Sequence, residues 1–281
     1  MTFDHILITR FNLKLWEQDK NHTDTRTDEW MRERFDLFEH YCLPAVAQQS
    51  CQQFTWLVLF ADDTKAEFRQ RIGQCQTVCP RLQPLFLTDE QMLDHKNFVR
   101  QYVFEHTAAE HVLTTSLDND DAIHRDFIAT LQQSAKEQAE EGLYTLVDGY
   151  QLFVKQKLLL RMHYPHNHFL SLLEKRAPEM VTVFSFRHAR ARKTVKRLFD
   201  IKKQPLWLEV VHPHNVRNDL RITSRVHYKC VWNEFSLSDF GIDQVLTAGS
   251  NWRNNLLRFP ALWLKTAVVR LGKKIGKKHD D

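Results

Sequence analysis

Three carboxylates lie within four residues of the sequence, directly after a short apolar run. Asp118, Asp120 and Asp121 follow the segment HVLTTSL, residues 111–117, and no basic residue occurs among them before Arg125. Repulsion among such close carboxylates is costly unless a cation neutralises it. Hard divalent ions such as Mg²⁺ or Mn²⁺ suit oxygen ligands and often bridge the phosphates of a substrate. The cluster therefore predicts a site for a metal ion and a diphosphate.

An ordinary helix cap is the alternative interpretation of these residues. Asp120 or Asp121 could accept the free N–H groups of a helix that begins near His124. A cap needs only one acidic residue and no apolar strand before it. This segment has three acidic residues and an apolar strand directly before them. We therefore favour the interpretation as a metal and diphosphate site.

The chain before the cluster alternates short apolar runs with helical periods. Strands are predicted at 6–9, 54–61, 82–87 and 111–117, and helices at 30–49 with a break near Pro44, 64–75, 98–108 and 124–140. This alternation indicates an α/β fold with a mostly parallel sheet flanked by helices. Ligands of such sheets bind beyond the carboxyl ends of the strands, where Asp62 and the aspartate cluster both fall.

After Gly142 the pattern changes to mixed β structure followed by helices. Strands at 143–148 and 151–157 flank Asp148-Gly149-Tyr150, which predicts a hairpin. The remaining elements are predicted as β-type runs at 180–186 and 207–211, a basic loop or frayed helix at 187–206, and C-terminal helices at 236–245 and 252–278. We expect a donor-binding half at 1–142, an acceptor-side half at 143–250 and a basic amphipathic tail at 251–281.

Charge is divided unevenly along the chain. Residues 1–150 contain 14 Lys/Arg and 25 Asp/Glu, a net charge of −11, whereas residues 151–281 contain 25 and 10, a net charge of +15. Segment 187–203 has eight basic residues and one acidic residue, and segment 253–278 has eight and none. This asymmetry predicts an anionic partner, which could be nucleic acid, anionic lipid or a phosphorylated substrate. A solvated basic face is the alternative.

The C-terminal tail combines its basic residues with apolar ones. Leu262, Trp263 and Val268 lie among the lysines and arginines, a mix that suits shallow docking on an anionic membrane. A helix packed on the core with a frayed lysine end is the alternative. The sequence has no apolar stretch near the roughly 20 residues of a spanning helix, and its start lacks the basic region of a secretory signal. We expect a cytoplasmic protein, peripheral on the inner face of the membrane.

Composition argues against several classes of protein. The chain is 43% hydrophobic and 26% charged, as is usual for a globular domain. It has only seven glycines and neither a GxGxxG nor a GxxxxGK[ST] motif, which argues against Rossmann dehydrogenases and P-loop NTPases. Its five cysteines form no disulfide framework or zinc-ligand pattern, so we expect packed, reduced thiols.

Four segments in order resemble one family. The segments are ILITRFNLK, WLVLFADDT, LDNDDA and LWLEVVHPHNVRND, and they are similar to segments of the putative rhamnosyltransferases of bacteria. Members of this family are nucleotide-sugar glycosyltransferases with a DxD motif, which LDNDDA resembles. The resemblance spans roughly residues 5–220, and it departs from the family pattern at Pro213-His214, where a glycine is expected after the histidine. It implies a GT-A-like fold and metal-dependent sugar transfer from a nucleotide-diphosphate sugar to a glycan or lipid-linked acceptor, in bacterial surface polysaccharide synthesis.

The resemblance also implies a role for matching residues. Asp118 and Asp120 would bind Mn²⁺ or Mg²⁺ and the donor diphosphate, with Asp118 turned toward the ribose. His212 would complete the metal site, and His214 and Asn215 are the next candidates, Asn215 as a donor contact. These assignments depend on the resemblance, because any one of fifteen histidines is weak evidence by itself.

Further donor contacts and a general base are implied in the same way. Arg10 and Asp62 would face the nucleobase and diphosphate, and Asp121 would contact the sugar or support the metal site from behind. Inverting transfer needs a base for the acceptor hydroxyl, and a carboxylate is usual. Glu174, after a Ser-Leu pair, is the first candidate and Asp148 the second. Alternatively, Arg10 pairs only with a surface acid, and Glu174 is an exposed helix residue.

Three other functions fit parts of the sequence. A nucleic-acid-binding protein would explain the basic half, but the sequence has no recognition motif and its first half is acidic. A metal-dependent phosphohydrolase could use the same aspartates. A degenerate transferase could serve as a scaffold without binding nucleotides. We favour the glycosyltransferase, with no nucleic-acid partner.

Overall fold

The computed structural model describes residues 1–15, 24–155, 158–186, 188–212, 225–226 and 231–237, with short pieces between 256 and 268. The predicted helices at 236–245 and 252–278 lie almost entirely outside the described residues. The same holds for His214 and Asn215, and for most of the tail at 251–281. Among the residues that are described, no helix is both long and apolar enough to cross a membrane.

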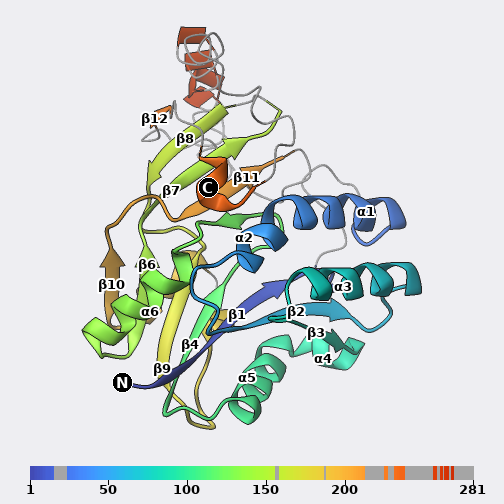
Figure 1. The fold of residues 1–281 in the computed structure, drawn as a ribbon, viewed down its shortest axis with the longest axis vertical. Coiled ribbons are helices and arrows are strands. Elements are labelled where there is room, and N and C mark those ends of the chain that lie inside the picture. Colours follow the sequence, from blue (N-terminus) through green and yellow to red (C-terminus); the bar gives the residue numbers. More distant parts are fainter. Residues whose placement is uncertain are drawn as a thin grey trace, which may run out of the picture.

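A seven-stranded sheet lies at the centre of the molecule, with the strand order β10-β6-β9-β4-β1-β2-β3 (Figure 1). Its strands are β1 Phe3–Arg10, β2 Thr55–Ala61, β3 Leu82–Leu87, β4 His111–Ser116, β6 Gly142–Leu146, β9 Leu170–Lys175 and β10 Leu198–Ile201. Neighbouring strands are parallel except where β9 pairs with β4 and with β6. The prediction of an α/β fold with a mostly parallel sheet is confirmed.

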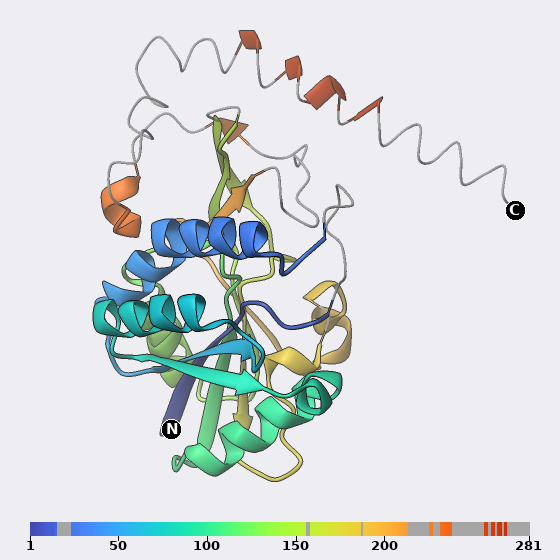
Figure 2. The same ribbon diagram turned by 90° about the vertical axis from the view of Figure 1, so that its right-hand side faces the viewer.

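Helices cover both faces of this sheet (Figure 2). They are α1 Asp28–Leu37, α2 Leu43–Ala47, α3 Ala66–Val78, α4 Asp89–Leu93, α5 His95–His106, α6 Phe127–Gln138 and α7 His188–Thr194. Alternate residues of β2 serve the two faces, because successive side chains of a strand point to opposite sides. Val58 packs in the core that α1, α3 and α6 cover, whereas Leu57 packs in the core under α4 and α5. This double burial explains the continuous apolar runs of the sequence.

The helix predicted over residues 30–49 is divided into three pieces. A π-helical turn at Phe38–Cys42 separates α1 from α2. Pro44 occupies the first turn of α2, where its missing N–H group is tolerated. The predicted break therefore lies just before the proline, at a π-helical turn that keeps the two short helices in one continuous path.

A second sheet of five short strands has the order β12-β8-β7-β11-β5. Its strands are β5 Ala122–Ile123, β7 Asp148–Phe153, β8 Leu158–His163, β11 Trp207–Val211 and β12 Arg225–Val226. Within the described residues, the chain passes between the two sheets without an intervening helix four times. The links are residues 117–121 from β4 to β5, Val147 from β6 to β7, 164–169 from β8 to β9 and 202–206 from β10 to β11. We call this region the seam between the sheets, and the aspartate cluster lies in it.

The predicted hairpin around Asp148-Gly149-Tyr150 is wrong. These residues are extended in β7, and β6 and β7 belong to different sheets. The glycine is needed for a close approach instead of a turn, because a Cβ atom on Gly149 would lie 2.0 Å from Cδ2 of Trp207. The Trp207 indole is buried over this glycine and donates its Nε1–H to the carbonyl of Leu146 at 2.8 Å.

Two further local predictions differ from the structure. The segment 180–186 contains a 3₁₀ turn at Val183–Ser185 in place of a strand, and Thr182 before it has a positive φ of 64°. The basic segment 187–206, predicted as a loop or frayed helix, contains the helix α7 and also the strand β10, which was not predicted. Ala191 of α7 is fully buried and packs with residues of the sheet, which holds this helix in place. Strands β8 and β9 were not predicted.

Replacing Gly149 by alanine should destabilise the protein by about 3 kcal/mol, because the new methyl group overlaps the Trp207 ring and the buried ring cannot retreat. Urea unfolding measures this change. Gly73→Ala on α3 is the control, since nothing lies within 4 Å of its added Cβ, and it should leave stability unchanged or raise it slightly. Equal unfolding midpoints for the two variants would contradict the role given to Gly149.

The buried His5 makes stability depend on pH. Its Nε2 lies 2.8 Å from Oγ1 of Thr115, and burial lowers the pKa of its imidazole from 6.5 to about 3. Below pH 6.5 the His5 imidazole therefore binds a proton in the unfolded chain but not in the native state. The free energy of unfolding consequently falls as the pH drops from 6.5 toward 3.

Replacing His5 by glutamine should remove about 1–3 kcal/mol of this stability loss between pH 6.5 and 4, since one unit of pKa shift corresponds to about 1.4 kcal/mol. Urea unfolding at several pH values measures the slope. His106→Gln, at the exposed end of α5, should leave the slope as in the wild type. An unchanged slope in His5→Gln would rule out the buried imidazole as its source.

Candidate active site

The aspartate cluster follows β4 at the carboxyl edge of the large sheet. Asn119 holds this loop to the end of β1, because its side-chain amide donates to the carbonyls of Arg10 at 3.0 Å and Phe11 at 3.3 Å. The backbone N–H of Asp121 donates to the carbonyl of Asp118 at 3.3 Å and closes a tight turn. Carboxylates that are neighbours in sequence therefore point in different directions.

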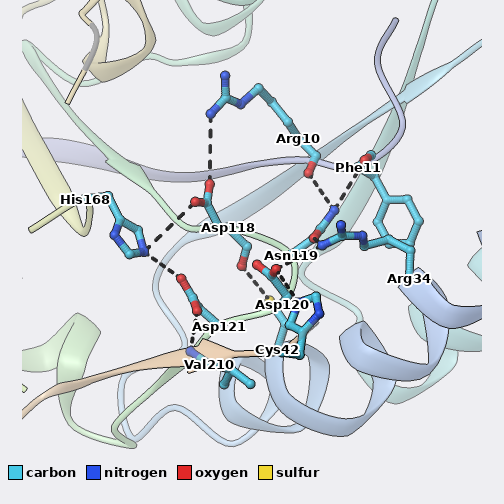
Figure 3. A network of polar contacts seen from close by, with 11 residues as sticks. Arg10, Phe11, Arg34, Cys42, Asp118, Asn119, Asp120, Asp121, His168 and Val210 are labelled. Carbon is cyan, nitrogen blue, oxygen red and sulfur yellow. Dashed lines mark hydrogen bonds and ion pairs between the residues drawn. The ribbon is translucent and has the colours of Figure 1, made fainter. Parts of the chain in front are cut away.

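His168 reaches the cluster because β9 is antiparallel to β4. In this pairing the start of β9 lies beside the end of β4, with Ser171 opposite Thr115. The residue just before β9 is thereby brought next to the residues just after β4. Nε2 of His168 lies 2.6 Å from Oδ2 of Asp121 and 4.0 Å from Oδ2 of Asp118 (Figure 3).

Asp118, Asp121 and His168 form a candidate metal site. One ligand atom from each lies within 4.8 Å of the other two. The second oxygen of Asp121 accepts the backbone N–H of Val210 at 2.8 Å, which fixes that carboxylate. Asp118 is the open side of the group, with its side chain 45% exposed. Two carboxylates and an imidazole suit Mn²⁺ better than Mg²⁺, which strongly prefers oxygen ligands.

Asp120 points to the other side of the loop, toward α1 (Figure 3). Its Oδ2 accepts hydrogen bonds from Nη1 of Arg34 and from Nε2 of His212, both at 2.9 Å. The same Arg34 nitrogen also donates to Oδ1 of Asn119 at 3.2 Å. All four side chains are buried. They form a second, closed group that fixes the aspartate loop against α1.

The predicted metal ligands are thus divided between two groups. Asp120 and His212 lie together, as expected, but a buried arginine lies with them. Asp118 lies in the other group, with Asp121 and His168. Arg10 lies beside this group, with its guanidinium 3.9 Å from the carboxylate of Asp118. Arg10 therefore forms an ion pair with the aspartate cluster.

The two buried aspartates differ in pKa for physical reasons. Burial by itself would raise the pKa of Asp120, but the hydrogen bond from His212 and the charge of Arg34 hold it well below its usual range. Burial raises the pKa of Asp121 to about 8, and the charges of Asp120 and Asp118 add to this shift. His168 opposes it. Asp121 and His168 therefore tend to share a proton. A bound cation would displace this proton.

His168 shows the other half of this coupling. Burial disfavours its charged form, but the nearby Asp121 carboxylate outweighs burial and raises the pKa of His168 to about 10. The imidazole of His168, which favours its charged form, and the carboxyl of Asp121, which favours its neutral form, lie 2.6 Å apart and titrate as a strongly coupled pair. Such perturbed groups gather at functional sites, where burial and like charges are tolerated for their chemistry.

Asp62 lies at the same edge of the sheet, directly after β2. Its backbone N–H donates to the carbonyl of Leu87 at 2.9 Å, which aligns the ends of β2 and β3. The neighbouring Asp63 forms an ion pair with Lys14 at 2.7 Å. The polar residues at the ends of β1, β2 and β3 thus lie along one edge of the sheet, together with Arg10. We call these strand ends the polar shelf.

Glu174 lies at the wrong edge of the sheet for the predicted role of general base. It pairs with Val112 at the start of β4, six residues before Asp118, and six strand residues span about 20 Å. Its carboxylate accepts the backbone N–H groups of Val181 at 2.9 Å and Thr182 at 2.8 Å. Glu174 is a strand residue that holds the 3₁₀ turn. The antiparallel direction of β9 explains why it points away from the site that His168 reaches.

Asp148 lies at the correct edge, two residues after β6 ends. β6 pairs with β9 so that Thr145 lies opposite Leu170, close to His168. The Asp148 carboxylate is 2.9 Å from Nδ1 of His163 and its side chain is 16% exposed. The structure therefore keeps Asp148 on the side of the molecule where the aspartate cluster lies.

Sequence reasoning missed Arg34, His168 and Glu209. Arg34 lies on the buried stripe of α1, between Met31 and Phe35, and a charge within such a stripe is a usable signal. Glu209 interrupts the apolar run of β11 and is buried, with Nε2 of Gln151 3.0 Å from its carboxylate. His168 had no sequence signal, since only the pairing of β9 with β4 brings it to the site.

These features define a class of protein. The mostly parallel seven-stranded sheet, the small mixed sheet and the acidic cluster at their seam form a GT-A-like α/β fold. The chain belongs to the family described as putative rhamnosyl transferase, whose family model matches residues 4–223. This membership confirms the resemblance seen in the sequence and identifies the protein as a glycosyltransferase.

Several solved structures are similar to the chain at low sequence identity. S. aureus TarS 1-349 in complex with UDP-GlcNAc is 11% identical, with a TM-score of 0.44 over 94% of this chain and 79% of that one. A putative nucleotide-diphospho-sugar transferase from Desulfovibrio desulfuricans G20 is 9% identical, with a TM-score of 0.36 over 73% and 82%. Comparison with curated proteins yields no match.

Replacing Arg34 by methionine should destabilise the protein by about 3 kcal/mol, because the buried Asp120 carboxylate then loses its cation. Chemical unfolding measures the effect. Arg32→Met on the same helix is the control, since Arg32 is 56% exposed and its ion pair with Glu67 is at 3.4 Å. An exposed pair of this kind contributes less than about 1 kcal/mol. Similar losses in both variants would show that Arg34 does not secure the loop.

Proposed function

We propose that the protein is a metal-dependent glycosyltransferase that moves a sugar from a nucleotide-diphosphate sugar to a glycan or lipid-linked acceptor, in bacterial surface polysaccharide synthesis. The observation that carries this proposal is the group of Asp118, Asp121 and His168 at the carboxyl edge of a parallel sheet. Ligands of α/β sheets bind at this edge. Family membership supplies the reaction class.

Asp118, Asp121 and His168 would hold the metal ion, with Mn²⁺ preferred over Mg²⁺ because of the imidazole ligand. A bound ion would supply positive charge to the leaving diphosphate. Asp120 and His212 would keep the loop in place through Arg34, in a change from the ligand set implied by the sequence. The buried position of Asp121 keeps water from one side of the site.

Arg10 and Asp62 would bind the donor from the shelf at the ends of β1 and β2. Arg10 is a third exposed and lies 3.9 Å from Asp118, so its guanidinium could move from the aspartate to a phosphate. Asn215, the other donor contact implied by the family, lies outside the described residues. Its role stays a prediction.

Asp148 is the proposed general base for the acceptor hydroxyl in an inverting transfer. It lies at the carboxyl edge, whereas Glu174 lies at the opposite one. Its partner His163 is more than half exposed, so the carboxylate can be approached from solvent. An acceptor bound beside β6 and β7 would reach Asp148 and the metal site from the same side.

Binding of Mn²⁺ with UDP, GDP, CDP or dTDP should stabilise the protein against heat. A ligand at 100 times its dissociation constant adds about 2.7 kcal/mol. His168→Leu should abolish the Mn²⁺-dependent part of this shift, because it removes one of three ligands. His166→Leu, at an exposed neighbour, should retain it. Electron paramagnetic resonance of Mn²⁺ gives an independent measure of metal binding in both variants.

The same assay separates the other functions. If no nucleotide stabilises the wild type with or without Mn²⁺, the donor site is wrong and the scaffold interpretation takes its place. Salt-sensitive binding to DNA or RNA without nucleotide binding would indicate a nucleic-acid-binding protein. Release of phosphate from simple esters would indicate a phosphohydrolase. Asp148→Asn should retain nucleotide binding and lose sugar transfer if Asp148 is the base.

A further inference from the structure

An exposed basic surface runs along α7 and β10. We call it the basic track and define it by five exposed residues: Arg190, Lys193, Lys196, Lys202 and Lys203. Arg190 and Lys193 are three residues apart and therefore lie on the same side of α7. Lys202 and Lys203 follow β10 at its carboxyl end, the edge of the sheet that holds the aspartate cluster.

The charges of the basic track are not neutralised within the described part of the chain. Two other basic residues of this segment have acidic partners, since Arg192 pairs with Asp200 at 2.6 Å and Arg197 pairs with Glu140. No ion pair is formed there by the five residues of the track. The track therefore presents five uncompensated positive charges, beside a first half of the chain with a net charge of −11.

The basic track begins at the candidate active site. The ring of His188, the first residue of α7, lies 6.3 Å from the ring of His168. Just before α7, the ring of Phe184 lies 5.3 Å from the guanidinium carbon of Arg10. The segment that leads into α7 therefore borders the group that holds Asp118. Figure 2 shows α7, in gold, on the outside of the large sheet.

Lipid is a poor match for this surface. A helix that lies on a membrane needs an exposed apolar face next to its basic face. Ala191 of α7 is fully buried in the core, and Val195, directly after α7, packs on the same core cluster. The exposed residues of α7 whose burial is described are His188, Arg190, Lys193 and Thr194, all polar or basic. In the described part of 188–203, Leu198 of β10 is the one large apolar residue that is exposed, at 38%.

Nucleic acid is also a poor match. Single strands are usually bound by basic grooves with free aromatic rings, on which the bases stack. The aromatic residues here are occupied, because Phe199 of β10 stacks on Tyr144 at 4.6 Å and Phe186 packs against the core. A flexible, polar polyanion without bases needs only spaced positive charges.

We propose that the basic track binds an anionic acceptor glycan, with carboxylate or phosphate groups along its chain, and leads its end to the seam between the sheets. This inference rests on the proposed function and adds the chemical class of the acceptor. α7 leads from His168 along the large sheet, and β10 returns to the edge that holds the aspartate cluster, so a polymer can contact several lysines while its end is at the cluster.

The test measures the affinity of the full-length protein for defined polyanions at low salt. The probes are a fluorescent oligogalacturonate, inorganic polyphosphate, a neutral maltodextrin of equal length, phosphatidylglycerol vesicles and single-stranded DNA. The track variant combines Lys193→Gln, Lys196→Gln and Lys202→Gln. The control variant combines Arg81→Gln, Lys136→Gln and Lys175→Gln, which are exposed residues elsewhere with the same loss of charge.

The wild type should bind one of the two polyanions and not the maltodextrin. Binding of oligogalacturonate would indicate an acceptor with carboxylate groups, and binding of polyphosphate would indicate one with phosphate groups. The dissociation constant should rise about tenfold or more in the track variant and much less in the control. Equal losses in both variants, or binding of neither polyanion, would overturn the proposal. So would a track variant that loses only binding to vesicles or DNA. Mn²⁺-nucleotide binding, measured in the same track variant, is expected to be unchanged and reports separately on the proposed function.

Discussion

Repulsion among three carboxylates within four residues is the constraint around which the site is built. The loop separates them by direction, with Asp118 and Asp121 on one side and Asp120 on the other. A buried cation, Arg34, compensates the second side permanently. The first side has His168 and the partly exposed Arg10, and in the proposed function it would bind a metal ion and an anionic ligand. One side of the loop is thus structural and the other is available for chemistry.

The seam between the two sheets gives this loop its rigidity. Antiparallel pairing of β9 places His168 beside the end of β4. β11 supplies the backbone N–H of Val210, and the residue directly after it supplies the ring of His212. Trp207 joins the sheets at the other end of β11, packed over Gly149 and bonded to Leu146. Strand pairing therefore brings residues that are far apart in sequence together at one site.

The uneven charge of the chain has a spatial counterpart. The acidic residues of the first half gather partly at the carboxyl edge of the sheet, where a cation is needed. The uncompensated basic residues of the second half lie along α7 and β10, next to that edge. In the proposed function, a donor bound through a metal ion and an anionic acceptor bound through lysines would meet at this edge.

The sequence by itself determined the α/β class and most strands of the parallel half, because burial on both faces leaves continuous apolar runs. It also singled out the aspartate cluster, because three carboxylates within four residues repel one another. Tertiary structure alone decided the partners. Asp120 is paired with Arg34, which α1 brings beside the aspartate loop. His168 joins Asp121 and Glu174 lies at the far edge because β9 runs antiparallel to β4 and β6. The direction of a strand depends on pairings between distant segments, and local residue patterns do not encode it.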